Sequence, residues 1–218
     1  MDDATVIRFP TERRIGAAAS PRAEASRAQA AQAAPAREAG PAAGEPFAFL
    51  SIEIRRLPLG DSSIDGGVAG RVLNRCVLSA LDVLSKQRSP VDLSGTVLRP
   101  VVQVTFGGPA GAVDAATAGL AVRDAVRKVQ RETEDEFHVF GAITAGTTCQ
   151  LETGVRVVTG WPQQAGAHLR EHATPGQILL ADDVWRSCRE AVEVEQRAVL
   201  VTLPGSDPIP SYPLTSIR

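Results

Sequence analysis

The side chains best suited to metal chemistry lie in one short segment. His168, Glu171 and His172 form an H-x-x-E-H pattern, and residues four apart share one face of a helix, so both imidazoles could reach a zinc ion. The segment ends at once at Thr174-Pro175-Gly176, and the acidic residues available as a third ligand follow closely after it. The pattern therefore favours a solvated helix end over a zinc site.

Two further groups of residues could carry chemistry. The loop Gly107–Gly111 precedes a helical pattern and could hold phosphate through its N–H groups, but it lacks the Lys and Ser/Thr of a phosphate-binding P-loop. It is better explained as a connection. Cys76, Cys149 and Cys188 are odd in number and widely spaced, which predicts reduced thiols and a cytoplasmic protein rather than a disulfide framework.

Composition narrows the classes of partner. The chain has 218 residues, a formal net charge of −2 and a pI near 6.0. A nucleic-acid partner is not expected, because neutralising phosphates requires a basic surface. No apolar run approaches the ~18 residues of a membrane helix, so no membrane partner is expected either.

The chain divides into a leader and one domain. Residues 16–44 contain 14 alanines among 29 positions, together with several prolines, and no aromatic residue lies between Phe9 and Phe47. Such a stretch cannot bury enough apolar surface to offset the entropy lost on ordering its backbone. We therefore predict a disordered leader over residues 1–45 and a folded domain over residues 47–218.

The hydrophobic pattern of the domain alternates strands and helices. Helices are expected over Val68–Leu84, Val113–Arg131, Pro162–Glu171 and Asp182–Arg189. Strands are expected over Phe47–Ile54, Thr96–Phe106 (two strands broken at Arg99-Pro100), Phe137–Ala145, Gly154–Thr159, Gln177–Leu180, Glu193–Leu203 and Ile209–Leu214. This order predicts an α+β fold, with helices on one face of a mainly antiparallel sheet.

Several of these segments together resemble the catalytic domain of class III nucleotidyl cyclases. Ala173–Val184 is similar to the family's "A-x-P-G-Q-I-L-V-S-x-x-V", and Val157–Leu169 lies where the family has "x-V-x-G-D-x-V-N-x-A-A-R-L". The other matching segments are Phe49–Ile54, Val101–Phe106, Gly141–Gly146 and Leu203–Tyr212. The resemblance covers residues 47–218 and implies the ferredoxin-like cyclase fold.

The resemblance also implies where catalytic groups should lie. Of the two aspartates that hold two magnesium ions in the family, the first falls on Glu53 and the second on Pro100, which has no ligand atom. The base-selecting aspartate falls on Trp161, the ribose-orienting asparagine on Gln164 and the phosphate-stabilising arginine on His168. Glu53 is thus the one remaining metal position, and no cofactor is expected unless a divergent enzyme uses magnesium or manganese.

Three functions follow from this pattern. The leading interpretation is a catalytically inactive cyclase-like domain that acts as a dimerising regulatory or interaction module in intracellular signalling. It would form a homodimer or pair with another cyclase-like chain. The alternatives are a divergent adenylate or guanylate cyclase that uses Glu53, and a small-molecule sensor whose cleft is lined by Trp161, Gln164 and His168.

Overall fold

The computed structural model describes residues 45–57, 66–87, 89–133, 136–150, 156–159, 162–202 and 208–218. The predicted leader, apart from residue 45, lies outside the described residues, and so does Trp161. Both remain predictions. None of the described helices combines the length and the hydropathy needed to cross a bilayer.

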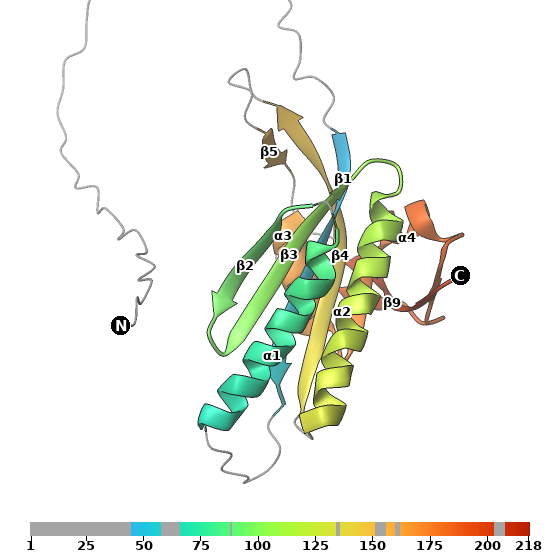
Figure 1. Cartoon of the computed structure of the whole chain (residues 1–218). Helices are drawn as coiled ribbons and strands as arrows, with labels where there is room; N and C mark the ends of the chain where they lie inside the picture. Colours follow the sequence, from blue (N-terminus) through green and yellow to red (C-terminus); the bar gives the residue numbers. More distant parts are fainter. Residues whose placement is uncertain are drawn as a thin grey trace, which may run out of the picture. The chain divides into compact units, whose positions relative to one another are not determined.

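A central strand organises the domain. Strand β1 (Glu45–Arg56) lies between β3 (Arg99–Gly107) and β4 (Phe137–Gln150) and is antiparallel to both (Figure 1). Its residues are buried without interruption from Phe47 to Ile54. Continuous burial, rather than alternation, shows that both faces of this strand are covered.

The sheet has the strand order β2-β3-β1-β4-β6-β9-β7, with β5 on β4 and β8 on β9. Every pair is antiparallel except β4 with β6. The remaining strands are β2 (Val91–Thr96), β5 (Arg156–Thr159), β6 (Gln177–Ala181), β7 (Val192–Val194), β8 (Val199–Val201) and β9 (Ile209–Ile217). The predicted α+β class and mainly antiparallel sheet are confirmed.

The helices do not all lie on one face, so that part of the prediction is wrong. Helices α1 (Gly66–Ser85) and α2 (Gly111–Thr133) lie side by side over one face, where Gly119 of α2 approaches Leu50 (Figure 1). Helix α3 (Pro162–His172) packs on the other face, where Gly166 approaches Phe49 and Ser51. Neighbouring residues of a strand point to opposite faces, so these contacts place α3 opposite α2. Helix α4 (Asp182–Cys188) follows β6.

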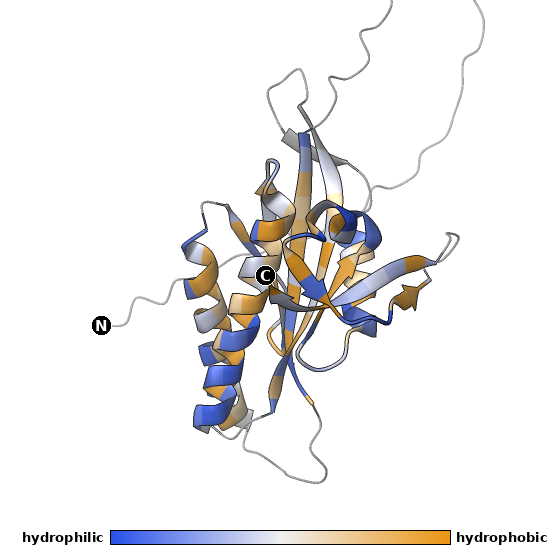
Figure 2. Ribbon diagram, turned by 90° about the vertical axis from the view of Figure 1, so that its right-hand side faces the viewer, coloured by the Kyte–Doolittle hydropathy of each residue, from blue (hydrophilic) through white to orange (hydrophobic). Residues whose placement is uncertain are grey.

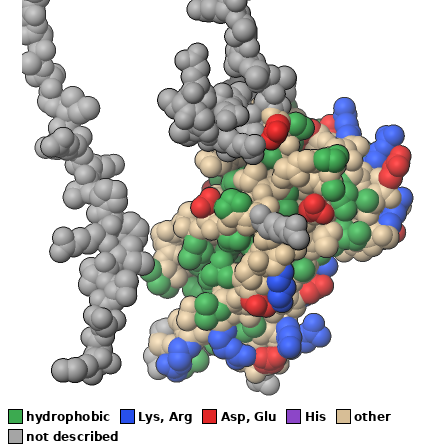
Figure 3. Space-filling model, turned by 45° about the horizontal axis from the view of Figure 1, so that its top comes forward, with side chains coloured by type: hydrophobic (Ala, Val, Ile, Leu, Met, Phe, Trp, Pro, Cys, Tyr) green, Lys and Arg blue, Asp and Glu red, His purple; other side chains and the backbone are tan. Residues whose placement is uncertain are grey.

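The distribution of hydrophobic residues agrees with this arrangement of helices on both faces of the sheet. Hydrophobic residues fill the central strands, while α1 and α2 carry hydrophobic residues in stripes between hydrophilic ones (Figure 2). The stripes are the amphipathic faces predicted from the helical spacing. On the face shown in Figure 3, basic, acidic and apolar side chains of the described residues are interspersed, without a continuous basic surface.

Two predicted strands differ from the structure. The turn between β2 and β3 falls at Val97 and Leu98, and Pro100 lies inside β3, paired with Gly95. A proline is tolerated there because it is close to the start of the strand. The predicted strand Glu193–Leu203 consists of the two short strands β7 and β8, which pair with opposite ends of β9 and are interrupted after a register shift at Glu193/Val194.

Candidate functional site

The central strand carries a carboxylate inside the molecule. Glu53 is only 5% exposed and lies between Val101 of β3 and Phe140 of β4 in the two ladders of β1. It shares a face with Ser51, two residues earlier, and Ser51 lies against α3. The Glu53 side chain is therefore fixed on the α3 side of the sheet.

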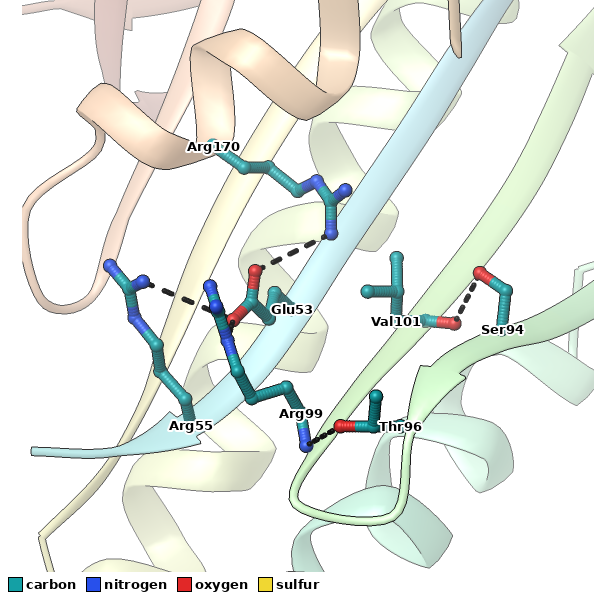
Figure 4. Close-up of polar contacts among 7 residues, drawn as sticks. All are labelled: Glu53, Arg55, Ser94, Thr96, Arg99, Val101 and Arg170. Atoms are coloured by element: carbon teal, nitrogen blue, oxygen red, sulfur yellow. Dashed lines mark hydrogen bonds and ion pairs between the residues drawn. The ribbon is translucent and has the colours of Figure 1, made fainter. Parts of the chain in front are cut away.

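Three arginines from three different elements converge on this carboxylate (Figure 4). Arg99, the first residue of β3, donates from Nε to Glu53 Oε1 at 2.6 Å. Arg170 of α3 places Nη1 3.7 Å from Oε2, and Arg55 of β1 places Nη1 3.9 Å from Oε1. We call these four residues the Glu53 cluster.

Local structure explains how Arg99 reaches this position. The tight turn after β2 is fixed by Thr96, whose hydroxyl accepts a hydrogen bond from the Arg99 backbone N–H at 3.1 Å. Gly95 adopts φ +87°, and a Cβ there would lie 2.3 Å from the Arg99 carbonyl oxygen. A side chain at residue 95 would thus be both strained and blocked. The ladder then places Val101 opposite Glu53, so Arg99 at the strand start can bend over the carboxylate.

The cluster shifts the pKa values of two of its arginines in opposite directions. The hydrogen bond to Glu53, together with its charge, raises the pKa of Arg99. Burial lowers the pKa of Arg170, and the negative charge of Glu53 opposes that shift. Arg55 also stacks over the Phe140 ring, with Cζ 3.7 Å from its centroid, in a cation–π contact. Guanidinium groups remain charged at any physiological pH, so the cluster holds three cations around one anion.

Comparison with known proteins rests on structure. No protein-family model matches the chain, and none of the curated proteins does. Among solved structures, the adenylyl cyclase CyaB from P. aeruginosa matches with a TM-score of 0.64 and 15% identity, over 80% of this chain and 95% of that one. The guanylyl cyclase Cya2 matches with a TM-score of 0.62 and 14% identity, over 81% and 95%.

A third match is the dimeric guanylyl cyclase domain of the RhoGC fusion protein from the aquatic fungus Blastocladiella emersonii. Its TM-score is 0.59 and its identity 10%, over 80% of this chain and 98% of that chain. The described domain has the fold of a class III nucleotidyl cyclase catalytic domain. At these identities, the match establishes the fold of this cyclase-fold domain and not its chemistry.

Of the other sequence-predicted positions that the structure describes, Pro100, Gln164 and His168, none forms a hydrogen bond or ion pair with Glu53. Pro100 is buried in β3. Gln164 is exposed on α3, and the His168 side chain is 37% exposed, with its ring 3.9 Å from the Glu171 carboxylate. A cavity of about 430 Å³ beside α3 is lined by Pro162 and Ala165 of that helix, not by Gln164 or His168.

The side chains of the H-x-x-E-H segment are not joined by a third metal ligand among the described residues. His172 Nδ1 lies 2.9 Å from the backbone carbonyl oxygen of His168. Within the described part of the chain, no three His, Cys, Asp or Glu side chains come close enough to hold a metal ion. The expected solvated helix end is only partly correct, because Arg170 within the same segment is 9% exposed.

The cyclase-fold domain does not offer a fitting magnesium pair in its described residues. Glu53 would be the anionic ligand on β1, but its Oε1 already accepts a short hydrogen bond from Arg99, and Pro100 supplies no oxygen ligand from its side chain. Magnesium requires oxygen ligands in near-octahedral geometry. A guanidinium thus lies against the carboxylate that such an ion would need.

None of the three arginines of the cluster was predicted from the sequence. Arg55 could have been found, because it lies two residues after Glu53 on the same face of one strand. Arg99 is 46 residues away in sequence, and Arg170 was assigned to a solvated helix. Only the ladder between β1 and β3 and the packing of α3 bring them together.

Proposed function

We propose that this chain is a cyclase-fold domain that does not cyclise nucleotides and acts as a dimerising regulatory or interaction module in intracellular signalling. The observation that carries the proposal is the 2.6 Å hydrogen bond from Arg99 to Glu53. At the position that resembles the first metal-binding aspartate, the charge of a metal ion is replaced by that of an arginine. Pro100 at the second position supports the same conclusion, since two-metal catalysis needs carboxylates to hold both ions.

The decisive experiment incubates the purified full-length chain with ATP or GTP and manganese and measures cyclic AMP and cyclic GMP by mass spectrometry. An active class III cyclase at the same concentration serves as the positive control. We expect no cyclic product. Product that forms with manganese and disappears with a chelator would overturn the proposal in favour of a divergent cyclase.

A second experiment restores one carboxylate and tests why the chain is expected to be inactive. The Pro100→Asp variant places a carboxylate at the second position but leaves Arg99 on Glu53 and His168 in place of an arginine. Losing one preorganised electrostatic contact costs roughly 3–4 kcal/mol of barrier, so we expect this variant to remain inactive. Manganese-dependent product from Pro100→Asp alone would show that the arginine contact does not prevent catalysis.

The dimer is supported by an exposed apolar hairpin tip. Val97 is 90% exposed and Leu98 is 77% exposed at the turn between β2 and β3. Adjacent large apolar side chains left in water commonly mark an interaction site. We expect Leu98→Ser to weaken self-association in sedimentation velocity. The matched control is Leu78→Ser on α1, where Leu78 is 56% exposed. A monomer at every accessible concentration would contradict the dimerising role.

A further inference from the structure

The Glu53 cluster has an excess of positive charge. Arg55, Arg99 and Arg170 surround one carboxylate, which leaves two positive charges without a buried counter-charge among the residues that the structure describes. Glu171 also contributes negative charge to the electrostatics of Arg99 and Arg170, but its side chain is 64% exposed. A charge in water is strongly screened, so Glu171 offsets only part of this excess.

The hydrogen bonds of the cluster are also incomplete. Glu53 accepts one hydrogen bond within bonding distance, from Arg99, while the contacts of Arg55 and Arg170 at 3.9 and 3.7 Å are too long. Nε and Nη1 of Arg170 are buried and have no hydrogen-bond partner in the described part of the chain, and the same holds for Nε of Arg55. Buried donors without an acceptor are costly. These donors are able to bind an acceptor that the described part of the chain does not itself provide.

The cluster is open on one side. The Arg99 side chain is 55% exposed and that of Arg55 is 26% exposed, whereas those of Glu53 and Arg170 are 7% and 10% exposed. Arg99 binds Glu53 through Nε, so its two Nη groups remain for a second acceptor. A ligand arriving from solvent would meet Arg99 and Arg55 first, with the buried charge of Arg170 behind them.

We infer that the Glu53 cluster is a metal-independent binding site for a phosphoryl dianion. The charge of such a group, close to −2, matches the excess of the cluster, and its three terminal oxygens match donors arriving from three elements. A single carboxylate would balance only half of the charge. Glu53 has a positioning role in this site, because it holds Arg99 in place without contacting the ligand. The inference is independent of the dimer and of the cyclisation assay.

The experiment is titration of the full-length chain with inorganic phosphate by calorimetry, in a chelator and at constant ionic strength, with chloride and acetate as reference anions. We expect saturable phosphate binding and much weaker acetate binding. Arg99→Gln should weaken phosphate binding at least about tenfold, as expected for a lost charge-assisted contact. The control is Arg75→Gln on α1, where Arg75 has a matching 2.7 Å ion pair with Glu132 and a 53% exposed side chain. This control should leave the affinity unchanged.

Nuclear magnetic resonance gives a second measurement of binding that does not depend on the heat measured by calorimetry. The side-chain Nε–H resonances of Arg55 and Arg170 should shift on adding phosphate in the wild type and shift less in Arg99→Gln. Circular dichroism verifies that each variant is folded. ATP in chelator distinguishes the source of the dianion: tighter binding than phosphate indicates a nucleotide, and equal binding indicates a free phosphate group, both of which uphold the site.

Four results would overturn the inference. The first is a phosphate response no larger than that of chloride, and the second is an equal loss of affinity in Arg75→Gln and Arg99→Gln. The third is acetate binding as strong as phosphate binding, which would reject a dianion. Binding that appears only after manganese is added would reject a metal-independent site.

Discussion

At the scale of single residues, Glu53 illustrates how a buried charge determines its surroundings. A carboxylate with a side chain only 7% exposed requires cations or donors close by, and here three guanidinium groups meet that need. The reverse also holds, because Arg170 is itself buried and depends on Glu53 for its nearest opposite charge. Removing the carboxylate therefore affects more than the bond to Arg99.

We expect Glu53→Gln to lower the free energy of unfolding by about 3–5 kcal/mol, because it leaves a buried guanidinium without its counter-charge. Glu132→Gln is the control. Its partner Arg75 is at the surface, and such pairs contribute about 0–1 kcal/mol. Urea unfolding followed by circular dichroism measures both. Equal, small effects would mean that Glu53 is solvated and the cluster is not formed in solution.

His138 on β4 predicts a pH dependence of stability. Burial lowers the pKa of His138 below its usual 6.5, with Glu136 opposing and Arg127 adding to the shift. Below pH 6.5 the unfolded chain binds the proton more readily than the folded one, so stability falls as pH decreases from 6.5 toward the folded pKa, and this loss levels off below it. His138→Gln should reduce the slope of unfolding free energy against pH in that window. An unchanged slope would show that other groups cause the pH dependence of stability.

At the scale of elements, glycines show where helices and strands approach closely. Gly141 of β4 faces β6, and a Cβ there would lie 2.7 Å from Cγ1 and 3.2 Å from Cβ of Ile178. Since the Ile178 Cβ is fixed to the backbone, it cannot easily move away. Gly70 on α1 is exposed, and nothing lies within 4 Å of a Cβ built there. The two positions should thus respond to alanine in opposite directions.

Gly141→Ala should destabilise the domain by about 1–3 kcal/mol, because it overpacks the contact between β4 and β6. Gly70→Ala should instead stabilise it by about 0.5–1 kcal/mol, because alanine loses less backbone entropy in a helix. Thermal unfolding of the wild type and of both variants measures these opposite changes in stability. A stabilised Gly141→Ala variant would show that β6 lies further from β4 than the structure places it.

At the scale of the whole molecule, β1 is paired with β4 along its complete length. Its ladder with β4 runs from Glu45, opposite Thr148, to Arg56, opposite Phe137. Phe47 and Phe49 are each 5% exposed in this ladder. The boundary between dispensable and essential sequence should therefore be sharp and lie close to residue 45.

Removal of residues 1–44 should leave the melting temperature within a few degrees, because the alanine- and proline-rich leader lacks the side chains to build a core. Removal through Phe49 should abolish cooperative unfolding, since it deletes Glu45–Phe49 from the 12-residue central strand, including two buried phenylalanines. Scanning calorimetry of the two truncated chains measures the difference. A large drop in the melting temperature on removing residues 1–44 would show that the leader packs on the domain.

The sequence by itself determined most of the elements and their order, with the exceptions of β2 and of the division between β7 and β8. Apolar residues at helical spacing predicted α1 and α2, and β-branched and aromatic residues predicted β1, all to within two residues of their bounds. The segments that resemble the cyclases, taken in order, predicted the fold. Such signals are local, and each is complete within one segment of chain.

Only the tertiary structure decided how charges meet at the site. Arg99 lies 46 residues from Glu53 in sequence, and nothing in either segment specifies the register that places Val101 opposite Glu53. Arg170 looks like a surface residue of a polar helix until α3 packs against β1 and buries it. Burial and pairing of charges arise from contacts between distant segments. From the sequence alone, the same four residues are therefore equally compatible with solvated side chains and with a buried cluster.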